Sequence, residues 1–217
     1  MKKIFEIAKN SPLFQEIAFS DFEPILNCLA AKTVSYHKDD LILLVGDAVN
    51  SIGLIVAGGV KIIKEDRDGH ITILTKLGVA DIFGEVLACA GIFHSPVTVQ
   101  AAAATEVLFI DYNKIIASCT NACHFHARLI KNMLRLLAEK SLMLEQKNNI
   151  LAKRTIRDKL WCFFDYQRGA ATEFSIPFNR EELAHYLCVD RSALSNELGK
   201  MRDQGLIKFN KNAFEIL

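Results

Sequence analysis

The sequence predicts an α+β protein with an N-terminal antiparallel β-roll of jelly-roll type, one long helix and a C-terminal helical bundle closed by a β-hairpin. Short β-rich runs recur at near-regular spacing between about residues 32 and 111. Residues 121–151 contain neither Gly nor Pro, and the remaining sequence has the pattern of helix, turn, helix and hairpin. The predicted parts are a β-roll domain over residues 1–120, a long helix and hinge over 121–152, and a third domain over 153–217.

Length and composition limit the possible classes of protein. A chain of 217 residues, 51% of them hydrophobic, can bury the cores of two modest domains. Its 26 basic and 25 acidic residues give a net charge of +1, so no overall basic field points to nucleic acid. The six cysteines are scattered, and neither a signal peptide nor a membrane-spanning apolar run is visible. We therefore expect a cytoplasmic protein with reduced thiols.

The β-rich region follows a helical start of about thirty residues and consists of apolar runs separated by turn residues such as Gly46-Asp47 and Gly58-Gly59. The predicted strands are residues 41–45, 51–57, 60–65, 70–77, 96–101 and 106–110. Strands of this length and spacing favour a small antiparallel roll over an α/β sheet.

The long helix carries two rows of side chains with heptad spacing. The first row is Ile130, Leu134, Leu137, Ser141, Leu144 and Asn148. The second row is Leu129, Met133, Leu136, Lys140, Met143, Lys147 and Ile150. One row can pack on the β-roll while the other meets a partner helix, so we predict that the first row is a dimer seam. The alternative is a helix that packs wholly within its own subunit.

The C-terminal region has the order of a winged helix-turn-helix. A helix with Leu160, Trp161, Phe163 and Phe164 for its core is followed by a short extended stretch. Two helices separated by a tight break at residues 188–190 come next, and two short strands around an Asn-Lys-Asn turn form the wing. Asn179 is the predicted N-cap of the first of these helices and Asp190 that of the second.

The second helix presents a polar face because Ala193, Leu194, Leu198 and Met201 anchor its other side. The predicted base-reading residues are Arg191, Ser192, Ser195 and Asn196. An arginine can donate two hydrogen bonds to guanine, and an asparagine can form a bidentate pair with adenine. The predicted phosphate contacts are Asn179, Arg180, Lys200, Arg202, Lys208 and Lys211. The alternative is an ordinary solvated helix surface.

Three segments carry a resemblance to a known family: "KRTIRDKL", "FNREELAHYLCVDRSALSNELGKMRDQGLI" and "DIFGE". With the β-rich region and the long helix, they resemble the CRP/FNR superfamily of bacterial transcription regulators over nearly the whole chain. The resemblance implies a homodimer that reads an inverted repeat in double-stranded DNA, with RNA polymerase as a partner if the protein is an activator. Family members commonly have an arginine where Asn196 stands, so the half-site is expected to differ.

The effector is predicted to be a small molecule other than cAMP. In the family's cyclic-nucleotide binders, the residues matching Gly84 and Glu85 hold the ribose, and an Arg-Ser pair binds the phosphate. Here Ser95 and Pro96 stand at the Arg-Ser positions, and the family's adenine-reading threonine and serine fall near Leu144 and Glu145. The missing arginine removes the charged partner that a phosphate needs. The predicted pocket residues are Gly84, Glu85, Leu87, Ser95, Leu137, Met143 and Leu144.

A metal, a haem or an iron–sulfur cluster would make the protein a redox, metal or haem-responsive regulator of the same family. Cys28 stands alone near the N-terminus, and His94 is a conceivable haem ligand. The segment "CTNACHFH" places Cys119, Cys123, His124 and His126 close together, but free cysteines usually pack as small apolar groups, so we expect no metal and no cofactor. No catalytic motif supports an enzyme. A ligand-binding module without DNA function would have no use for an exposed Arg191.

Overall fold

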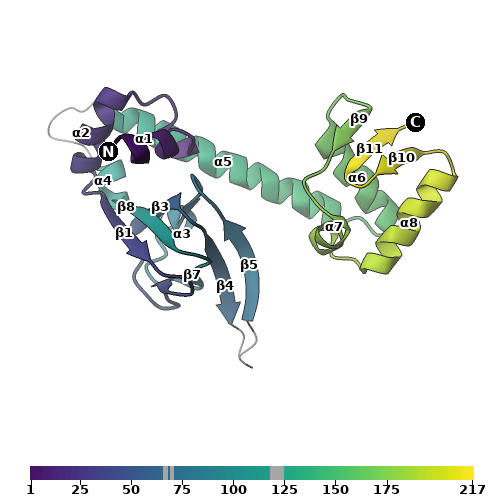
Figure 1. Cartoon of the computed structure of the whole chain (residues 1–217), viewed down its shortest axis with the longest axis horizontal. Helices are drawn as coiled ribbons and strands as arrows, with labels where there is room; N and C mark the ends of the chain where they lie inside the picture. The colour runs from purple at the N-terminus through teal and green to yellow at the C-terminus, as the bar shows by residue number, and fades with distance from the viewer. Residues whose placement is uncertain (66–67, 69–70, 118–124) are drawn as a thin grey trace. The chain divides into compact units, whose positions relative to one another are not determined.

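The computed structural model describes residues 1–65, 68, 71–117 and 125–217. The chain divides into two compact units, Met1–Ala138 and Glu139–Leu217, with the division inside helix α5 (Phe125–Leu151). Figure 1 shows the helices and strands of each unit, and each unit has its own hydrophobic core. The finer division at residues 120 and 152 stays a prediction.

The first unit contains two four-stranded antiparallel sheets. Their strand orders are β1-β8-β3-β6 and β2-β7-β4-β5. The strands are β1 (Lys32–Tyr36), β2 (Leu41–Leu43), β3 (Ser51–Ala57), β4 (Val60–Glu65), β5 (Ile71–Leu77), β6 (Ile82–Phe83), β7 (Thr98–Ala101) and β8 (Thr105–Asp111). The predicted antiparallel roll is confirmed, and each of the six predicted runs contributes a strand. Two further strands, β1 and β6, complete the sheets.

Short helices surround this roll. They are α1 (Lys2–Ala8), the 3-10 turn η1 (Pro12–Phe14), α2 (Phe19–Cys28), α3 (Glu85–Cys89) and α4 (Tyr112–Ile116). One core lies between these helices and the sheet that contains β3 and β8. A second core lies inside the roll, where the Phe83 ring packs edge-on against Phe109 at 6.2 Å. An added Cβ on Gly53 would come within 2.3 Å of Phe83 Cζ, so the ring lies directly on the β3 backbone.

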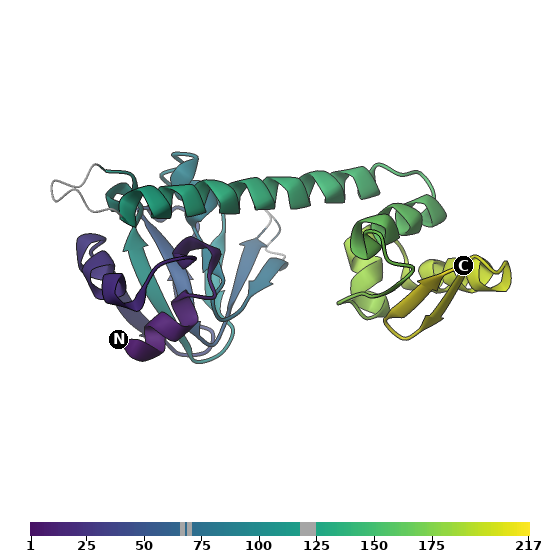
Figure 2. The same cartoon turned by 90° about the horizontal axis from the view of Figure 1, so that it is seen from above.

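The first part of α5 is anchored in the first unit, and Figure 2 shows it lying along the roll. Leu129, Met133 and Leu136, all from the second heptad row, are buried in the unit's helix-covered core. Asn132 is buried beside them and donates from Nδ2 to the carbonyls of Leu13 at 3.0 Å and Gln15 at 2.9 Å. The prediction that one row packs on the roll is confirmed for this part of the helix.

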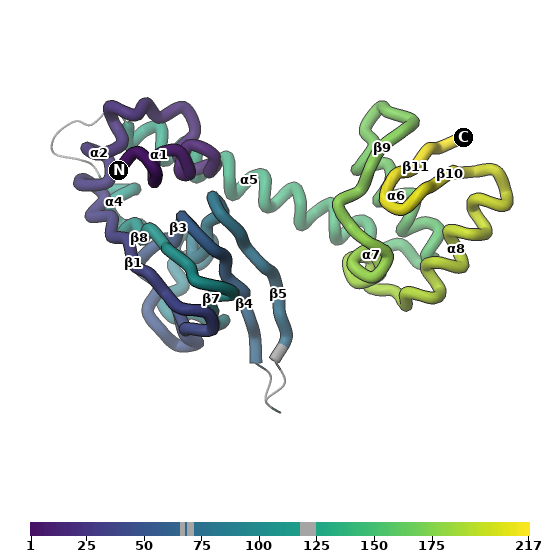
Figure 3. The backbone as a smooth tube through the Cα atoms, viewed as in Figure 1, coloured from purple at the N-terminus to yellow at the C-terminus, as the bar shows by residue number. Residues whose placement is uncertain are grey.

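The second unit is a winged helix-turn-helix, as the sequence predicts. Its elements after α5 are α6 (Ile156–Arg168), β9 (Glu173–Ser175), α7 (Arg180–Leu187), α8 (Arg191–Asp203), β10 (Ile207–Asn210) and β11 (Ala213–Ile216). The strands form one antiparallel sheet in the order β10-β11-β9, which brings the segment before α7 beside the C-terminal hairpin (Figure 3). Phe163, Phe164 and Phe214 lie at the centre of the core, and Ile150 near the end of α5 is buried with them.

Candidate nucleic-acid interface and effector domain

Helix α7 begins with a complete capping box, which confirms Asn179 as its N-cap. Asn179 Oδ1 accepts hydrogen bonds from the backbone N–H groups of Glu181 and Glu182, both at 2.9 Å. Glu182 Oε2 accepts in return from the Asn179 N–H at 2.8 Å. The carbonyl oxygen of Asn179 is therefore used within the helix end, and only its Nδ2 group remains to donate to a phosphate.

The turn between the two helices is set by two adjacent features. Cys188 ends α7 in the left-handed conformation, at φ 51° and ψ 55°, which turns the chain sharply. Asp190 then caps α8, since its Oδ1 accepts from the N–H groups of Ser192 at 2.8 Å and Ala193 at 2.9 Å. The hydrogen bond from the Ser192 hydroxyl, followed by that from the Ala193 N–H, lowers the pKa of Asp190. The carboxylate is thus stabilised as an anion at the positive end of α8.

Helix α8 presents the polar face that the sequence predicts. Leu194, Leu198 and Met201 are buried on its inner side. Arg191, Ser195 and Asn196 are exposed, and their side chains form no hydrogen bond or ion pair with any residue that the structure describes. Ser192 is also exposed, but its hydroxyl donates to Asp190, so only its lone pairs are left for a base.

The basic residues around α8 differ in how free their charges are. Arg202 pairs with Asp203 at 2.9 Å, and Lys200 lies 4.0 Å from Glu197. Lys211 lies in the wing turn at φ 52°, is exposed, and has no partner within the described part of the chain. Of the residues predicted to contact phosphate, Lys211 offers the least encumbered cation.

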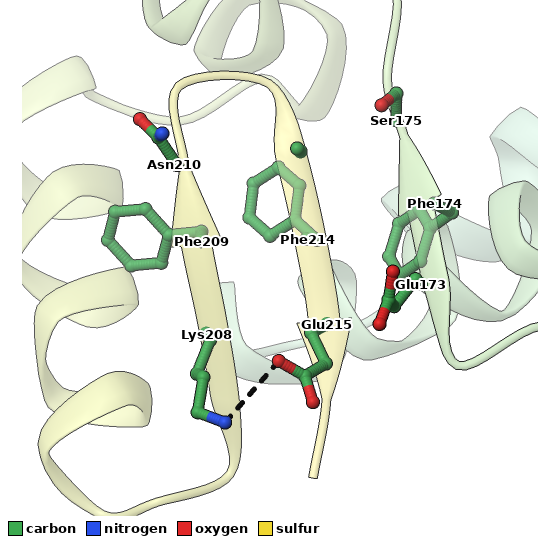
Figure 4. Close-up of a pocket in the computed structure, with 9 residues that line it drawn as sticks. Glu173, Phe174, Ser175, Lys208, Phe209, Asn210, Phe214 and Glu215 are labelled. Carbon is green, nitrogen blue, oxygen red and sulfur yellow. Dashed lines mark ion pairs between the residues drawn. The ribbon is translucent and has the colours of Figure 1, made fainter.

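The face of the wing sheet forms a hollow of about 560 Å³ (Figure 4). Phe174, Phe209 and Phe214 are among the residues that line it. Lys208 at its edge pairs with Glu215, with Nζ 3.4 Å from Oε2. Because this carboxylate offsets the lysine charge, a phosphate contact from Lys208 would have to compete with Glu215.

Arg180 is placed differently from the solvated position that a phosphate contact suggests. Its guanidinium lies over the rings of Phe209 and Phe214, with its carbon 4.9 and 5.1 Å from their centroids. Burial lowers its pKa, and Nη1 is buried without a hydrogen-bond partner among the described residues. A guanidinium that stacks on aromatic rings keeps its N–H donors in its own plane, so the predicted phosphate contact of Arg180 stays a prediction.

Sequence reasoning missed Arg157 and Lys159, two residues at the start of α6. Arg157 pairs with Glu197 on α8, and Lys159 Nζ donates to the carbonyl of Leu187 at the end of α7 at 3.0 Å. Both residues lie in the run "KRTIRDKL". Nothing in that run shows that Arg157 will contact Glu197, 40 positions later, or that Lys159 will contact Leu187, 28 positions later. These contacts fix the two helices of the motif to α6.

The predicted effector residues do not all meet in one cavity. Gly84, at φ +83°, caps α3 and lines a cavity of about 270 Å³ inside the roll, beside Asn50, Phe83 and Phe109. Glu85 is buried next to it. Ser95 is also buried, and its hydroxyl donates to the Val97 carbonyl at 2.7 Å. None of the residues that line this cavity carries a positive charge.

The other predicted pocket residues lie in two different settings. Leu87 and Leu137 are half-buried at the margin of the helix-covered core of the first unit. Met143 and Leu144 belong to the second unit and are exposed. Their joint role in a pocket stays a prediction.

The predicted dimer seam is solvent-facing in the single chain. Leu134 is 64% exposed and Leu144 is 63% exposed, and Ile130, Ser141 and Asn148 are also exposed. Leu137 is the exception, since it is half-buried against its own unit. Exposed leucines on this row fit a surface that a second helix covers.

The candidate metal and haem ligands are only partly described. Cys119, Cys123 and His124 lie outside the described residues. His126 is buried and lies next to Cys28. His94 is exposed, with Nδ1 2.9 Å from the Gly46 carbonyl oxygen.

Comparison with protein families accounts for both units. Residues 33–121 match the cyclic nucleotide-binding domain, and residues 128–217 match the Crp-like helix-turn-helix domain. The chain belongs to the CRP/FNR family of transcription regulators. It is therefore a DNA-binding regulator with an effector domain and not an enzyme, as the sequence predicts.

Relatives of this regulator match it along most of its length. The chain is 25% identical over 214 residues to the CRP-like cAMP-activated global transcriptional regulator of Mycobacterium tuberculosis, covering 94% of this chain and 91% of the relative. The c-di-GMP responsive global regulator CLP of Xanthomonas campestris has a similar fold, with a TM-score of 0.57, 18% identity and coverage of 92% and 99%. A CooA mutant from Carboxydothermus hydrogenoformans gives a TM-score of 0.58 at 19% identity, with coverage of 89% and 85%. Within the described ranges, no helix of the regulator is long and apolar enough to span a membrane.

Proposed function

We propose that this regulator acts in the cytoplasm as a homodimer that binds an inverted-repeat operator with two copies of α8, under the control of a small-molecule effector other than cAMP. The observation that carries the proposal is the outer face of α8, where Arg191, Ser195 and Asn196 are exposed and unpaired on a firmly anchored helix. In helix-turn-helix proteins these N-terminal positions enter the major groove.

The surface of α5 supports a two-fold symmetric dimer. Leu134 and Leu144 are exposed on one row of the helix, while Leu129 and Leu136 on the other row are buried. A symmetric dimer that covers the first row would bring two recognition helices to half-sites about 34 Å apart, one turn of DNA. RNA polymerase is a partner in this proposal if the regulator is an activator.

The effector domain supports a ligand without a cyclic phosphate. Ser95 stands where the family's cyclic-nucleotide binders have an arginine, and its hydroxyl is used by the Val97 backbone. The cavity inside the roll is lined mostly by apolar side chains. The relatives include a cAMP-activated regulator and a c-di-GMP responsive regulator, so similarity alone does not select an effector.

The test is capture of fragmented genomic DNA from the source organism by the purified regulator, with and without added cell extract. An inverted repeat among the retained fragments, lost with Arg191→Ala and kept with the control Arg168→Ala, would support the proposal, because Arg168 lies at the end of α6 and pairs with Asp165. Retention of the same fragments by Arg191→Ala would contradict base reading by this residue. Calorimetric titration with cAMP is expected to show no binding at micromolar concentrations, and tight binding would remove the effector part of the proposal.

A further inference from the structure

Cys28 and His126 meet across the first unit although 98 residues separate them. Cys28 is the last residue of α2, His126 is the second residue of α5, and the distance from Sγ to Nε2 is 3.3 Å. The sequence shows Cys28 as an isolated cysteine and gives no sign of this contact. The fold therefore adds a thiol to the histidine that ends the segment "CTNACHFH".

The His126 ring is held in a fixed and largely dry position. Its side chain is buried, with 9% of the residue exposed, and the Phe125 ring lies 5.1 Å from it at an angle of 31°. Its second nitrogen, Nδ1, is buried without a hydrogen-bond partner in the ranges that the structure describes. A buried imidazole whose only polar contact among these residues is a sulfur atom needs an explanation, because buried polar groups are normally satisfied.

We propose that Cys28 Sγ and His126 Nε2 are two ligands of one divalent metal ion of the zinc class. Zinc binds cysteine sulfur at about 2.3 Å and histidine nitrogen at about 2.0–2.1 Å. With the two ligand atoms 3.3 Å apart, these bond lengths give an angle of roughly 100° at the metal, near the tetrahedral value. The donor set is the one that zinc prefers in proteins, a thiolate with an imidazole.

Two other cysteines, Cys89 and Cys188, have polar contacts but do not face a histidine side chain. Cys89 has a hydrogen bond with the Tyr112 hydroxyl, and Cys188 Sγ lies 3.7 Å from the backbone carbonyl of His185. Cys28 instead faces a side chain in the first turn of a 27-residue helix.

The described residues supply two of the four ligands that zinc usually takes, and no group of three such side chains occurs among them. In this proposal water completes the coordination of the ion. The proposal therefore concerns Cys28 and His126 alone, and metal binding by this pair does not depend on dimerisation or on DNA.

The experiment measures zinc bound by the full-length regulator under reducing conditions, by elemental analysis and by competition with a chromophoric chelator. We expect one zinc ion per chain. Cys28→Ser and His126→Gln should each weaken zinc affinity by at least about tenfold. Loss of a residue that only hydrogen-bonds to a metal ligand already costs about tenfold or more, and loss of a direct ligand should cost no less. The control Cys162→Ser changes a cysteine of the second unit and should bind like the wild type.

Three outcomes would overturn the proposal. The wild type could bind no zinc, or both variants could bind it as tightly as the wild type. Loss of binding in Cys119→Ser and Cys123→Ser with full binding in Cys28→Ser would mean that the metal is held without Cys28.

A ligand swap separates coordination from packing and covers the case in which a single variant does not fold. Cys28→His combined with His126→Cys keeps both kinds of ligand and should restore zinc binding to within about tenfold of the wild type. Cobalt added to the wild type should show thiolate-to-metal charge-transfer absorption in the near ultraviolet. A wild-type spectrum without that absorption would contradict coordination by Cys28, whatever the variants do.

Discussion

Arg157 and Glu197 form an ion pair between the first turn of α6 and the middle of the recognition helix α8, with Nε 2.5 Å from Oε1. The pair is partly buried, since the arginine side chain is 34% exposed and the glutamate side chain 17%. Arg157 Nη1 also donates to Gln204 Oε1 at 3.0 Å, just after α8 ends. One guanidinium thus contacts α8 at two points and fixes the direction in which Arg191 and Asn196 project.

Glu197→Ala should lower the free energy of unfolding of the regulator by about 1–2 kcal/mol, between the values for exposed pairs and for charged hydrogen bonds. The substitution leaves the partly buried Arg157 guanidinium without its charged partner, and only its hydrogen bond to Gln204 remains. Chemical denaturation of the second unit measures the change. The control is Asp203→Ala, because the Asp203–Arg202 pair is exposed and its loss should cost less than about 0.5 kcal/mol. Equal costs for the two variants would show that the Arg157–Glu197 pair does not hold α8.

Arg191→Ala and Lys211→Ala should weaken DNA binding in different ways. Removal of Arg191 should cost about 1–3 kcal/mol of binding free energy on the operator and relax the preference at one base pair. Removal of Lys211 should weaken all sequences alike and lower the slope of log K against log salt by about 1. Fluorescence anisotropy on an operator panel at several salt concentrations measures both effects. Identical behaviour of the two variants would contradict the division into base reader and phosphate contact.

Leu134→Lys should break the dimer without unfolding the chain. Leu134 is 64% exposed in the single chain, so the substitution costs the isolated protomer little. In a two-fold seam it places two ammonium groups at the interface and should raise the dimer dissociation constant by roughly 100-fold or more. Sedimentation over a concentration series measures it. Leu142→Lys is the control, since Leu142 is 57% exposed but lies on neither heptad row. A dimer that survives Leu134→Lys and dissociates with Leu142→Lys would place the seam on another face.

Local patterns predicted the fold because its elements depend on nearby residues. Alternation of apolar residues and turn signals located the six strands, and Asn179 and Asp190 marked the starts of α7 and α8. The short strand β6 and helix α3 could not be predicted in the same way. Two to five residues carry too little periodicity, and these elements form because Phe83 packs into the roll and Glu85 is buried next to Gly84.

The details of the candidate sites could not be predicted because they depend on long-range contacts. The sequence shows Arg180 as a cation near a helix start, and only the fold places it over Phe209 and Phe214. It shows Lys208 and Glu215 seven residues apart, but their pairing depends on the register of β10 and β11. The Cys28–His126 contact spans 98 residues and had no local signal.

Asp190→Asn should change how stability depends on pH. The Ser192 hydroxyl and the Ala193 N–H lower the pKa of Asp190 in the folded state, so the folded protein binds fewer protons at this site than the unfolded chain. Its stabilising contribution is therefore complete above the ordinary pKa of a carboxyl and is lost as the pH falls through the lower folded value. Asparagine keeps the cap but does not titrate.

The denaturation midpoints of the wild type and Asp190→Asn should differ by a constant amount between about pH 5 and 8 and converge only as the pH falls below about 4. Thermal denaturation at several pH values measures the difference. Asp68→Asn, in the first unit, should leave the acid dependence of the second unit unchanged. A difference that grows on acidification would mean that the carboxylate does not stabilise α8.

Gly53→Ala should destabilise the first unit because the new methyl group would meet a packed ring. The added Cβ would lie 2.3 Å from Phe83 Cζ, and that ring is buried and packs edge-on against Phe109. Overpacking of this kind costs about 1–3 kcal/mol. The matched control is Gly199→Ala inside α8, where no atom lies within 4 Å of the new Cβ, so helix propensity should stabilise the second unit by about 1 kcal/mol. Chemical denaturation should thus give shifts of opposite sign.

If Phe83 is the cause, Gly53→Ala combined with Phe83→Leu should cost less free energy of unfolding than the sum of the two single changes, since the smaller side chain relieves the clash. Additive costs would mean that Gly53 is constrained by something other than this ring.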